Sequence, residues 1–102
     1  MSKITAKQEI QRLESIYNET EALLQDLEQV LLRLEDNAPR FLQLQEYYYS
    51  EAWGRDHEAA AAGAFADIEC GILSEDLFYN QLGDRQQYAI RMMEIALSIL
   101  KS

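Results

Sequence analysis

The fold of this chain is decided by the stretch AKQEIQRLESIYNETEALLQDLEQVLLRLED, residues 6–36. Its apolar residues recur at alternating steps of three and four, the spacing that places side chains on one face of an α-helix. We call this series the apolar seam: Ile10, Leu13, Tyr17, Leu24, Leu27, Leu31 and Leu34, with Thr20 as the polar interruption. Ile16, Leu23 and Val30 lie beside the seam and widen it. The stretch therefore predicts one long amphipathic helix whose apolar face has the width typical of a helical bundle.

Residues at both ends predict where this helix begins and ends. Thr5 and Gln8 have the spacing of a capping box, in which a hydroxyl accepts a hydrogen bond from the first turn. The segment DNAP, residues 36–39, predicts an end, because proline is tolerated in a first helical turn and disfavoured in the interior. A second helix is expected to run from there to about Ser50. The short connection predicts that it returns antiparallel along the first.

One flank of the apolar seam carries a glutamate at every seventh residue. We call this series the glutamate rail: Glu14, Glu21, Glu28 and Glu35. Charges at these positions can select a partner helix, or they can form an ordinary solvated border. The sequence leaves both interpretations open.

The middle of the chain, residues 51–73, has the least regular pattern. The letters EAAAAG predict a short helix, with Asp56 as its cap and Gly63 as its end. No period holds from Ala64 to Gly71, and we expect an ordered loop there that Phe65, Ile68 and Leu73 attach to the core.

The last third of the chain predicts two more helices. Ser74 has the position of an N-cap, and acidic residues follow it where they suit the helix dipole. Gly83 predicts the end of that helix, and a final helix is expected over residues 85–101. Polar residues of this final helix form one narrow stripe, so nearly all of its circumference is apolar. Such a helix is either central to the bundle or covered by a second copy, which makes a homodimer through residues 85–101 one hypothesis.

Together these patterns predict an all-α fold in a single helical domain, residues 1–102. The expected architecture is an antiparallel helical bundle of three main helices plus one short helix, with an ordered acidic loop at about 51–73. One proline and four glycines leave little room for turns, which agrees with a helical chain.

The net charge of −9 argues against nucleic-acid binding, since phosphate contacts need clustered Lys and Arg. The charge concentrates in residues 38–83, where eight acids accompany two bases. An acidic surface favours a basic protein partner, or serves solubility alone.

The single cysteine, Cys70, excludes an internal disulfide framework and a multi-cysteine zinc site. No signal sequence and no run of about 18 apolar residues occur, so we expect neither secretion nor membrane insertion. The cytoplasm is the expected location.

Motifs for catalysis are missing from the sequence. It has no glycine-rich phosphate loop, no GxSxG and no HExxH. Cys70 and His57 form at most a weak nucleophile–base candidate, and we expect no catalytic residue, no enzyme activity and no cofactor. The run Asp56, His57 and Glu58 raises a divalent-metal hypothesis, but its spacing matches no metal-binding motif and no metal ligand is assigned.

The stretch YYYSEAWGRDHE, residues 47–58, holds three tyrosines, the only tryptophan and the only histidine. Helical phase predicts that Tyr48 is buried and that Tyr47 and Tyr49 point to the flanks. Trp53 is expected either to close the end of the bundle or to contact a partner, since Tyr and Trp at a surface edge are enriched in interface hot spots.

This stretch, followed by GILSEDLFYNQL at residues 71–82, resembles the bacterial domain of unknown function 4298 family. The matching residues are Tyr48, Tyr49, Ser50, Trp53, Asp56, Gly71, Ile72, Leu73, Ser74, Glu75, Asp76, Tyr79 and Leu82. The run AAAAG at residues 59–63 departs from the acids that the family tends to have there. The resemblance implies a small helical bacterial protein and brings no activity. It leaves two roles open for the motif acids: structural caps and hydrogen-bond acceptors, or part of a surface.

The leading hypothesis is a non-enzymatic module that binds a basic protein surface, as a small regulator, inhibitor or immunity-type protein. We call its expected surface the acidic-aromatic face: Tyr47, Tyr49, Trp53, Asp56, Glu75, Asp76 and Tyr79. One alternative is an inhibitor that mimics nucleic acid through the glutamate rail. The other alternative is a carboxylate-rich protein that binds a divalent metal.

Overall fold

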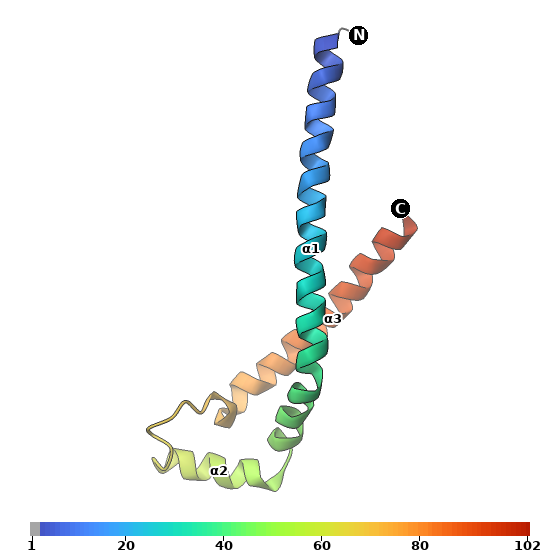
Figure 1. Cartoon of the computed structure of the whole chain (residues 1–102). Coiled ribbons are helices and arrows are strands. Elements are labelled where there is room, and N and C mark those ends of the chain that lie inside the picture. Colours follow the sequence, from blue (N-terminus) through green and yellow to red (C-terminus); the bar gives the residue numbers. More distant parts are fainter. Residues whose placement is uncertain (1–2) are drawn as a thin grey trace. The chain divides into compact units, whose positions relative to one another are not determined.

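The structure, a computed structural model, describes residues 3–102, with side chains from Thr5 onward. It contains three α-helices and one short 3-10 helix: α1 (Lys3–Tyr48), α2 (Glu51–Ala61), η1 (Gly71–Leu73) and α3 (Glu75–Lys101) (Figure 1). No strand occurs in residues 3–102, so the predicted all-α class is confirmed. The chain divides into two compact units, Met1–Leu42 and Gln43–Ser102, which are described separately below.

The predicted helix end at residues 36–39 is wrong. Pro39 lies inside α1, which continues to Tyr48 without a break, so no separate second helix begins here. An interior proline removes one backbone hydrogen bond and disfavours the helix by about 3 kcal/mol. The residues on both sides continue the helix, and an ion pair across the proline supports it, with Arg40 Nη2 2.6 Å from Asp36 Oδ2.

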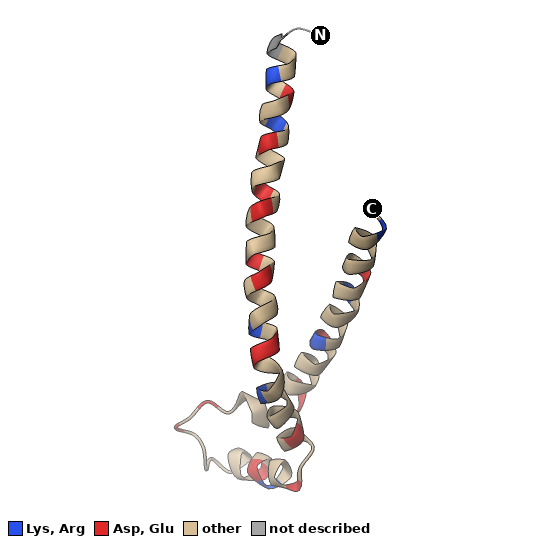
Figure 2. Ribbon diagram, turned by 45° about the vertical axis from the view of Figure 1, so that its right-hand side comes forward, with Lys and Arg blue, Asp and Glu red and all other residues tan. Residues whose placement is uncertain are grey.

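The first unit is a single stretch of α1, whose apolar seam is confirmed as one helical face. Every residue of the seam has an exposed side chain, because a lone helix cannot bury its own apolar face. Acidic residues follow one another along this stretch, and basic residues lie near its start and again near its end (Figure 2). A salt bridge joins Arg12 Nη2 to Glu9 Oε1 at 2.6 Å within the first turns.

The second unit begins with the last turn of α1 and continues into α2. Ser50 is the N-cap of α2, because its Oγ accepts a hydrogen bond from the Trp53 backbone N–H at 3.4 Å. The short helix therefore begins before Asp56, and the predicted cap at Asp56 is wrong. The helix ends next to Gly63, as predicted, and Gly63 has a φ of 89°, a value that glycine adopts without strain.

The predicted acidic loop at 51–73 is shorter in the structure. Residues 51–61 form α2, residues 62–70 form turns and bends, and η1 follows. Leu73 is buried, whereas Phe65 is half-buried and Ile68 exposed. Of the three residues expected to attach the loop, Leu73 is the one that lies in the core.

The final helix is longer than predicted. Ser74 is confirmed as its N-cap, with the Leu77 backbone N–H donating to Ser74 Oγ at 3.3 Å. Gly83 does not end this helix, which continues from Glu75 to Lys101. A glycine inside a helix costs only about 1 kcal/mol, and the helix-forming residues that follow Gly83 outweigh this penalty. Phe78 on α3 is the most buried side chain of the described residues, with 3% of its surface exposed.

Candidate functional site

An aromatic cluster organises the second unit, with Tyr48 at its centre. The Tyr48 ring lies edge-on to Tyr49 and Trp53, with centroids 5.1 and 5.2 Å apart, and it contacts Phe78 at 4.7 Å. These separations are typical of favourable aromatic pairs. The cluster joins the last turn of α1, the first turn of α2 and the start of α3. Tyr48 was predicted to be buried; it contacts the buried Phe78, but its own side chain is half-buried.

Three side chains donate hydrogen bonds to the backbone of η1 and of the first turn of α3. Trp53 Nε1 donates to the Ile72 carbonyl at 2.8 Å, and the Tyr48 hydroxyl donates to the Glu75 carbonyl at 3.1 Å. His57 Nδ1 lies 2.6 Å from the Leu73 carbonyl. The 3-10 segment is too short to satisfy its Ile72 and Leu73 carbonyls, so Trp53 and His57 hold it in place, while Tyr48 attaches the first turn of α3. We call the three donors Tyr48, Trp53 and His57 the clasp.

The position of His57 assigns its ring nitrogens. A carbonyl can only accept, so Nδ1 carries the proton in this hydrogen bond. The other nitrogen, Nε2, lies 3.6 Å from Glu75 Oε1 and forms an ion pair with it when the ring is protonated. The imidazole also stacks on the indole of Trp53, with centroids 4.8 Å apart and an angle of 11° between the planes. The sequence interpretation missed this structural role of His57, although its spacing of four from Trp53 predicts that both lie on one helix face.

Tyr47 and Asp56 form a second link between α1 and α2. The Tyr47 hydroxyl donates to Asp56 Oδ2 at 2.6 Å. This hydrogen bond raises the pKa of Tyr47 to about 12, and partial burial and the negative charge of Asp56 act in the same direction. The structural role considered for the motif acids, acceptance of a tyrosine hydrogen bond, is confirmed for Asp56.

The seven residues of the acidic-aromatic face thus differ in their surroundings. Tyr47, Trp53 and Asp56 are half-buried and bonded within the unit. Tyr49 and Tyr79 have exposed fractions of 69% and 68%. Glu75 and Asp76 are also exposed, in the first turn of α3. Trp53 holds the η1 backbone that precedes Glu75 and Asp76, and the bond between Tyr47 and Asp56 links the end of α1 to α2 on either side of Tyr49.

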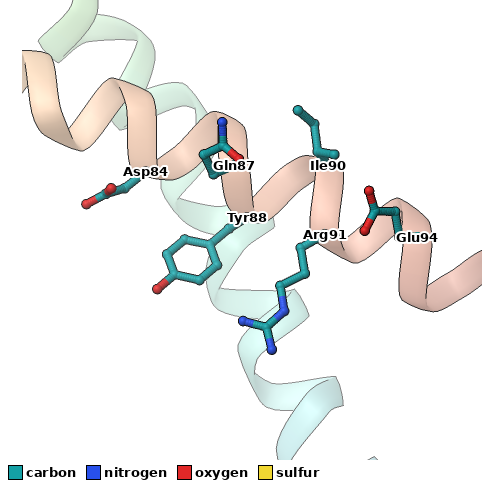
Figure 3. Close-up of a pocket in the computed structure, with 6 residues that line it drawn as sticks. All are labelled: Asp84, Gln87, Tyr88, Ile90, Arg91 and Glu94. Atoms are coloured by element: carbon teal, nitrogen blue, oxygen red, sulfur yellow. The ribbon is translucent and has the colours of Figure 1, made fainter.

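A shallow hollow of about 450 Å³ lies elsewhere, along the polar stripe of α3 (Figure 3). The residues around it all belong to this one helix: Asp84, Gln87, Tyr88, Ile90, Arg91 and Glu94. The sequence interpretation assigned no function to these residues. A site lined by one helix face cannot surround a small substrate, so the hollow does not resemble a ligand pocket.

The remaining candidates for chemistry are Cys70, His57 and the acidic side chains. Cys70 is a free, half-buried thiol, and the contacts of His57 are with Leu73, Trp53 and Glu75. Within the described residues, no group of three or more His, Cys, Asp or Glu side chains is arranged to hold a metal ion. No helix in that same part of the chain is both long and apolar enough to cross a membrane.

Comparison with known proteins identifies the family. The model of the family called Domain of unknown function (DUF4298) matches residues 10–95, which is most of the chain. The protein therefore belongs to this family, and the resemblance drawn from the two motifs is confirmed. No curated protein and no solved structure matches the chain. The matched region contains the clasp, most of α1 and the greater part of α3.

Proposed function

We propose that this protein is a non-enzymatic interaction module that binds a basic surface of another protein through the exposed members of its acidic-aromatic face. One observation carries the proposal: two highly exposed tyrosines accompany two exposed carboxylates on a backbone that the clasp holds in place. Tyrosine supplies large contact area at a low cost in conformational entropy. A preorganised surface loses less entropy on binding than a flexible one.

The positions of these residues support the proposal further. Glu75 and Asp76 precede Tyr79 by four and three residues, so all three lie on one side of α3. Carboxylates beside an aromatic ring suit Lys and Arg, whose charged groups pair with the acids and whose stems pack on the ring. The negative charge of residues 38–83 would also speed encounter with a basic partner. The proposal places the protein in the cytoplasm, where the Cys70 thiol stays reduced.

The test is affinity capture from a lysate of the native host, quantified by mass spectrometry. The double variant Tyr49→Ala with Tyr79→Ala is expected to lose the captured proteins. Tyr88→Ala is the matched control, since Tyr88 is 62% exposed and also lies on α3, outside the face. If wild type, double variant and control capture the same proteins equally, or capture none, the proposed binding surface is wrong.

A second candidate function, mimicry of nucleic acid, draws support from the continuity of α1. The four residues of the glutamate rail are exposed and lie on one unbroken helix, with a rise of roughly 10 Å between successive members. A row of carboxylates can stand in for phosphates on a nuclease or DNA-binding protein. Replacing all four with glutamine should then abolish capture of such proteins, while the tyrosine double variant retains it. The opposite pattern favours the acidic-aromatic face.

We further propose that α1 and α3 pack antiparallel, as expected for a helical bundle. Contact between Tyr48, the last residue of α1, and Phe78 near the start of α3 supports this arrangement. Leu34 precedes Tyr48 by 14 residues, and Met92 follows Phe78 by 14 residues. In an antiparallel pair of helices these two residues would therefore lie at the same level. Cysteines at both positions in a Cys70→Ser chain should form a disulfide within one molecule on oxidation. Disulfides that form solely between molecules would contradict the arrangement.

A further inference from the structure

Among the helices of residues 3–102, α1 extends further back from Tyr48 than α2 or α3 is long. The Tyr48 hydroxyl bonds to Glu75, so α3 begins beside the end of α1. With 27 residues, α3 rises about 40 Å, whereas the 46 residues of α1 rise about 69 Å. Whatever direction α3 takes, it can cover α1 no further back than about residue 22. Residues 3–21, which we call the α1 overhang, extend past that limit.

The α1 overhang carries part of the apolar seam and its border. Ile10, Leu13, Ile16 and Tyr17 are all exposed there, with fractions between 47% and 65%. These four large side chains lie on one face within eight residues and form an apolar strip. In water, such a strip on a helix is normally buried against another helix. No other helix within residues 3–102 is long enough to cover this strip, and a second chain would cover it.

The charges of the α1 overhang indicate what that chain is. Residues 3–12 carry three bases and one acid, whereas residues 13–21 carry three acids and no base. Two copies that pair antiparallel place the basic half of each against the acidic half of the other. Two copies that pair in parallel place like charges together. Charge complementarity therefore favours an antiparallel second copy.

Heptad positions give the same result residue by residue. With Ile10 at position a, the e positions are Lys7, Glu14 and Glu21, and Glu9 is at g. In an antiparallel pair, e positions face e positions. When Leu13 packs against Tyr17 of the partner subunit, Lys7 lies level with Glu21 of the partner subunit, and this pair occurs twice. Glu14 lies opposite Glu14 of the partner subunit once. The antiparallel pair therefore has two attractive charge pairs and one repulsive charge pair.

A parallel pair has the opposite balance. Its g positions face the e positions of the following heptad, which would bring Glu9 to Glu14 of the partner subunit twice. We infer that the protein forms a homodimer in which the α1 overhangs of two copies pair antiparallel, with Lys7 opposite Glu21 of the partner subunit. This dimer uses a surface separate from the acidic-aromatic face, so both can be occupied at once.

Charge reversal with sedimentation equilibrium tests the dimer. Lys7→Glu or Glu21→Lys turns two attractive pairs into two repulsive ones, and each variant is expected to raise the dimer dissociation constant roughly tenfold. An equimolar mixture of the two single variants should form heterodimers with near wild-type affinity, because each new charge then meets its opposite. The double variant Lys7→Glu with Glu21→Lys should also regain the homodimer.

Two control variants make the result specific. Glu19→Lys has the same charge change two residues from Glu21, at an outward-facing heptad position, and should leave the dissociation constant within about twofold of wild type. Met93→Glu probes the alternative dimer through residues 85–101 and should also leave dimerisation intact. Circular dichroism of each variant monitors helix content.

The inference is overturned by any of three results. The first is a wild-type monomer at hundred-micromolar concentration. The second is failure of the mixed single variants to associate more tightly than either alone. The third is loss of the dimer in Met93→Glu with no effect of the charge reversals. Capture of a basic protein by the acidic-aromatic face is measured separately, so either proposal can fail without the other.

Discussion

The two units of this protein stabilise their helices in different ways. Residues 3–42 form a stretch of α1 with a regular apolar seam and local side-chain pairs, such as Glu9 with Arg12. Residues 43–102 contain irregularly spaced motif residues that meet in the clasp and bury Phe78. A regular seam defines the apolar face of a helix but does not define which segment packs against that face. Irregular motifs specify particular contacts, and in this protein those contacts determine the local fold.

The largest effect expected from this difference comes from the core of the second unit. Phe78→Ala removes the most buried side chain and should lower the free energy of unfolding by about 3–4 kcal/mol. Leu77→Ala is the neighbouring control, since Leu77 is 60% exposed, and should cost below about 1 kcal/mol. Urea unfolding followed by circular dichroism measures both. Equal losses would show that the aromatic cluster is not the core of this unit.

The next effect concerns the clasp itself. Trp53→Phe keeps an aromatic ring beside Tyr48 but removes the donor to the Ile72 carbonyl. Leaving a half-buried carbonyl without its donor should cost about 1–2 kcal/mol. Hydrogen exchange of backbone amides in residues 71–77 should accelerate, while exchange in α1 before residue 42 stays unchanged. Uniform acceleration along the chain would contradict a local role for this hydrogen bond.

A pH titration tests the link between α1 and α2. The pKa of Tyr47 is raised to about 12 from an unfolded value near 10, because its hydroxyl donates to Asp56. The stability that it contributes is therefore complete below pH 10 and is lost as the pH rises from 10 toward 12. At this partly exposed site we expect roughly 1 kcal/mol. In Tyr47→Phe, the free energy of unfolding should fall less steeply between pH 10 and pH 12 than in the wild type. An unchanged dependence on pH would contradict the assignment.

The smallest effects come from two glycines with opposite backbone requirements. Gly83 lies inside α3 with no atom within 4 Å of an added Cβ, so Gly83→Ala should stabilise the protein by about 0.5–1 kcal/mol. Gly63 has a positive φ, so Gly63→Ala should destabilise it by about 1 kcal/mol. Thermal unfolding of both variants measures the difference. Changes of the same sign would contradict the helical assignment of residue 83.

Periodicity and capping patterns predicted the helical class, the apolar seam, the N-cap at Ser74 and the end of the short helix next to Gly63. They misplaced the boundaries at Pro39 and Gly83, because a local penalty of 1–3 kcal/mol does not end a helix whose flanking residues all favour it. For the candidate site, helical phase placed Tyr48 on the side that contacts the buried Phe78, although its own side chain is half-buried. The donors to the Ile72 and Leu73 carbonyls were not predictable, since they connect residues 16 to 19 positions apart. Such contacts depend on tertiary geometry that single-helix patterns do not encode.

The position of the only tryptophan gives this protein a built-in optical probe of one unit. Trp53 stacks on His57 and contacts Tyr48, so its fluorescence emission reports the second unit alone. Far-ultraviolet circular dichroism reports helix from both units, with α1 as its largest contributor. Coincidence of the two denaturation curves is the established sign of an all-or-none transition. One sample, followed with two wavelengths of light, thus reveals whether the long helix and the clasp unfold cooperatively.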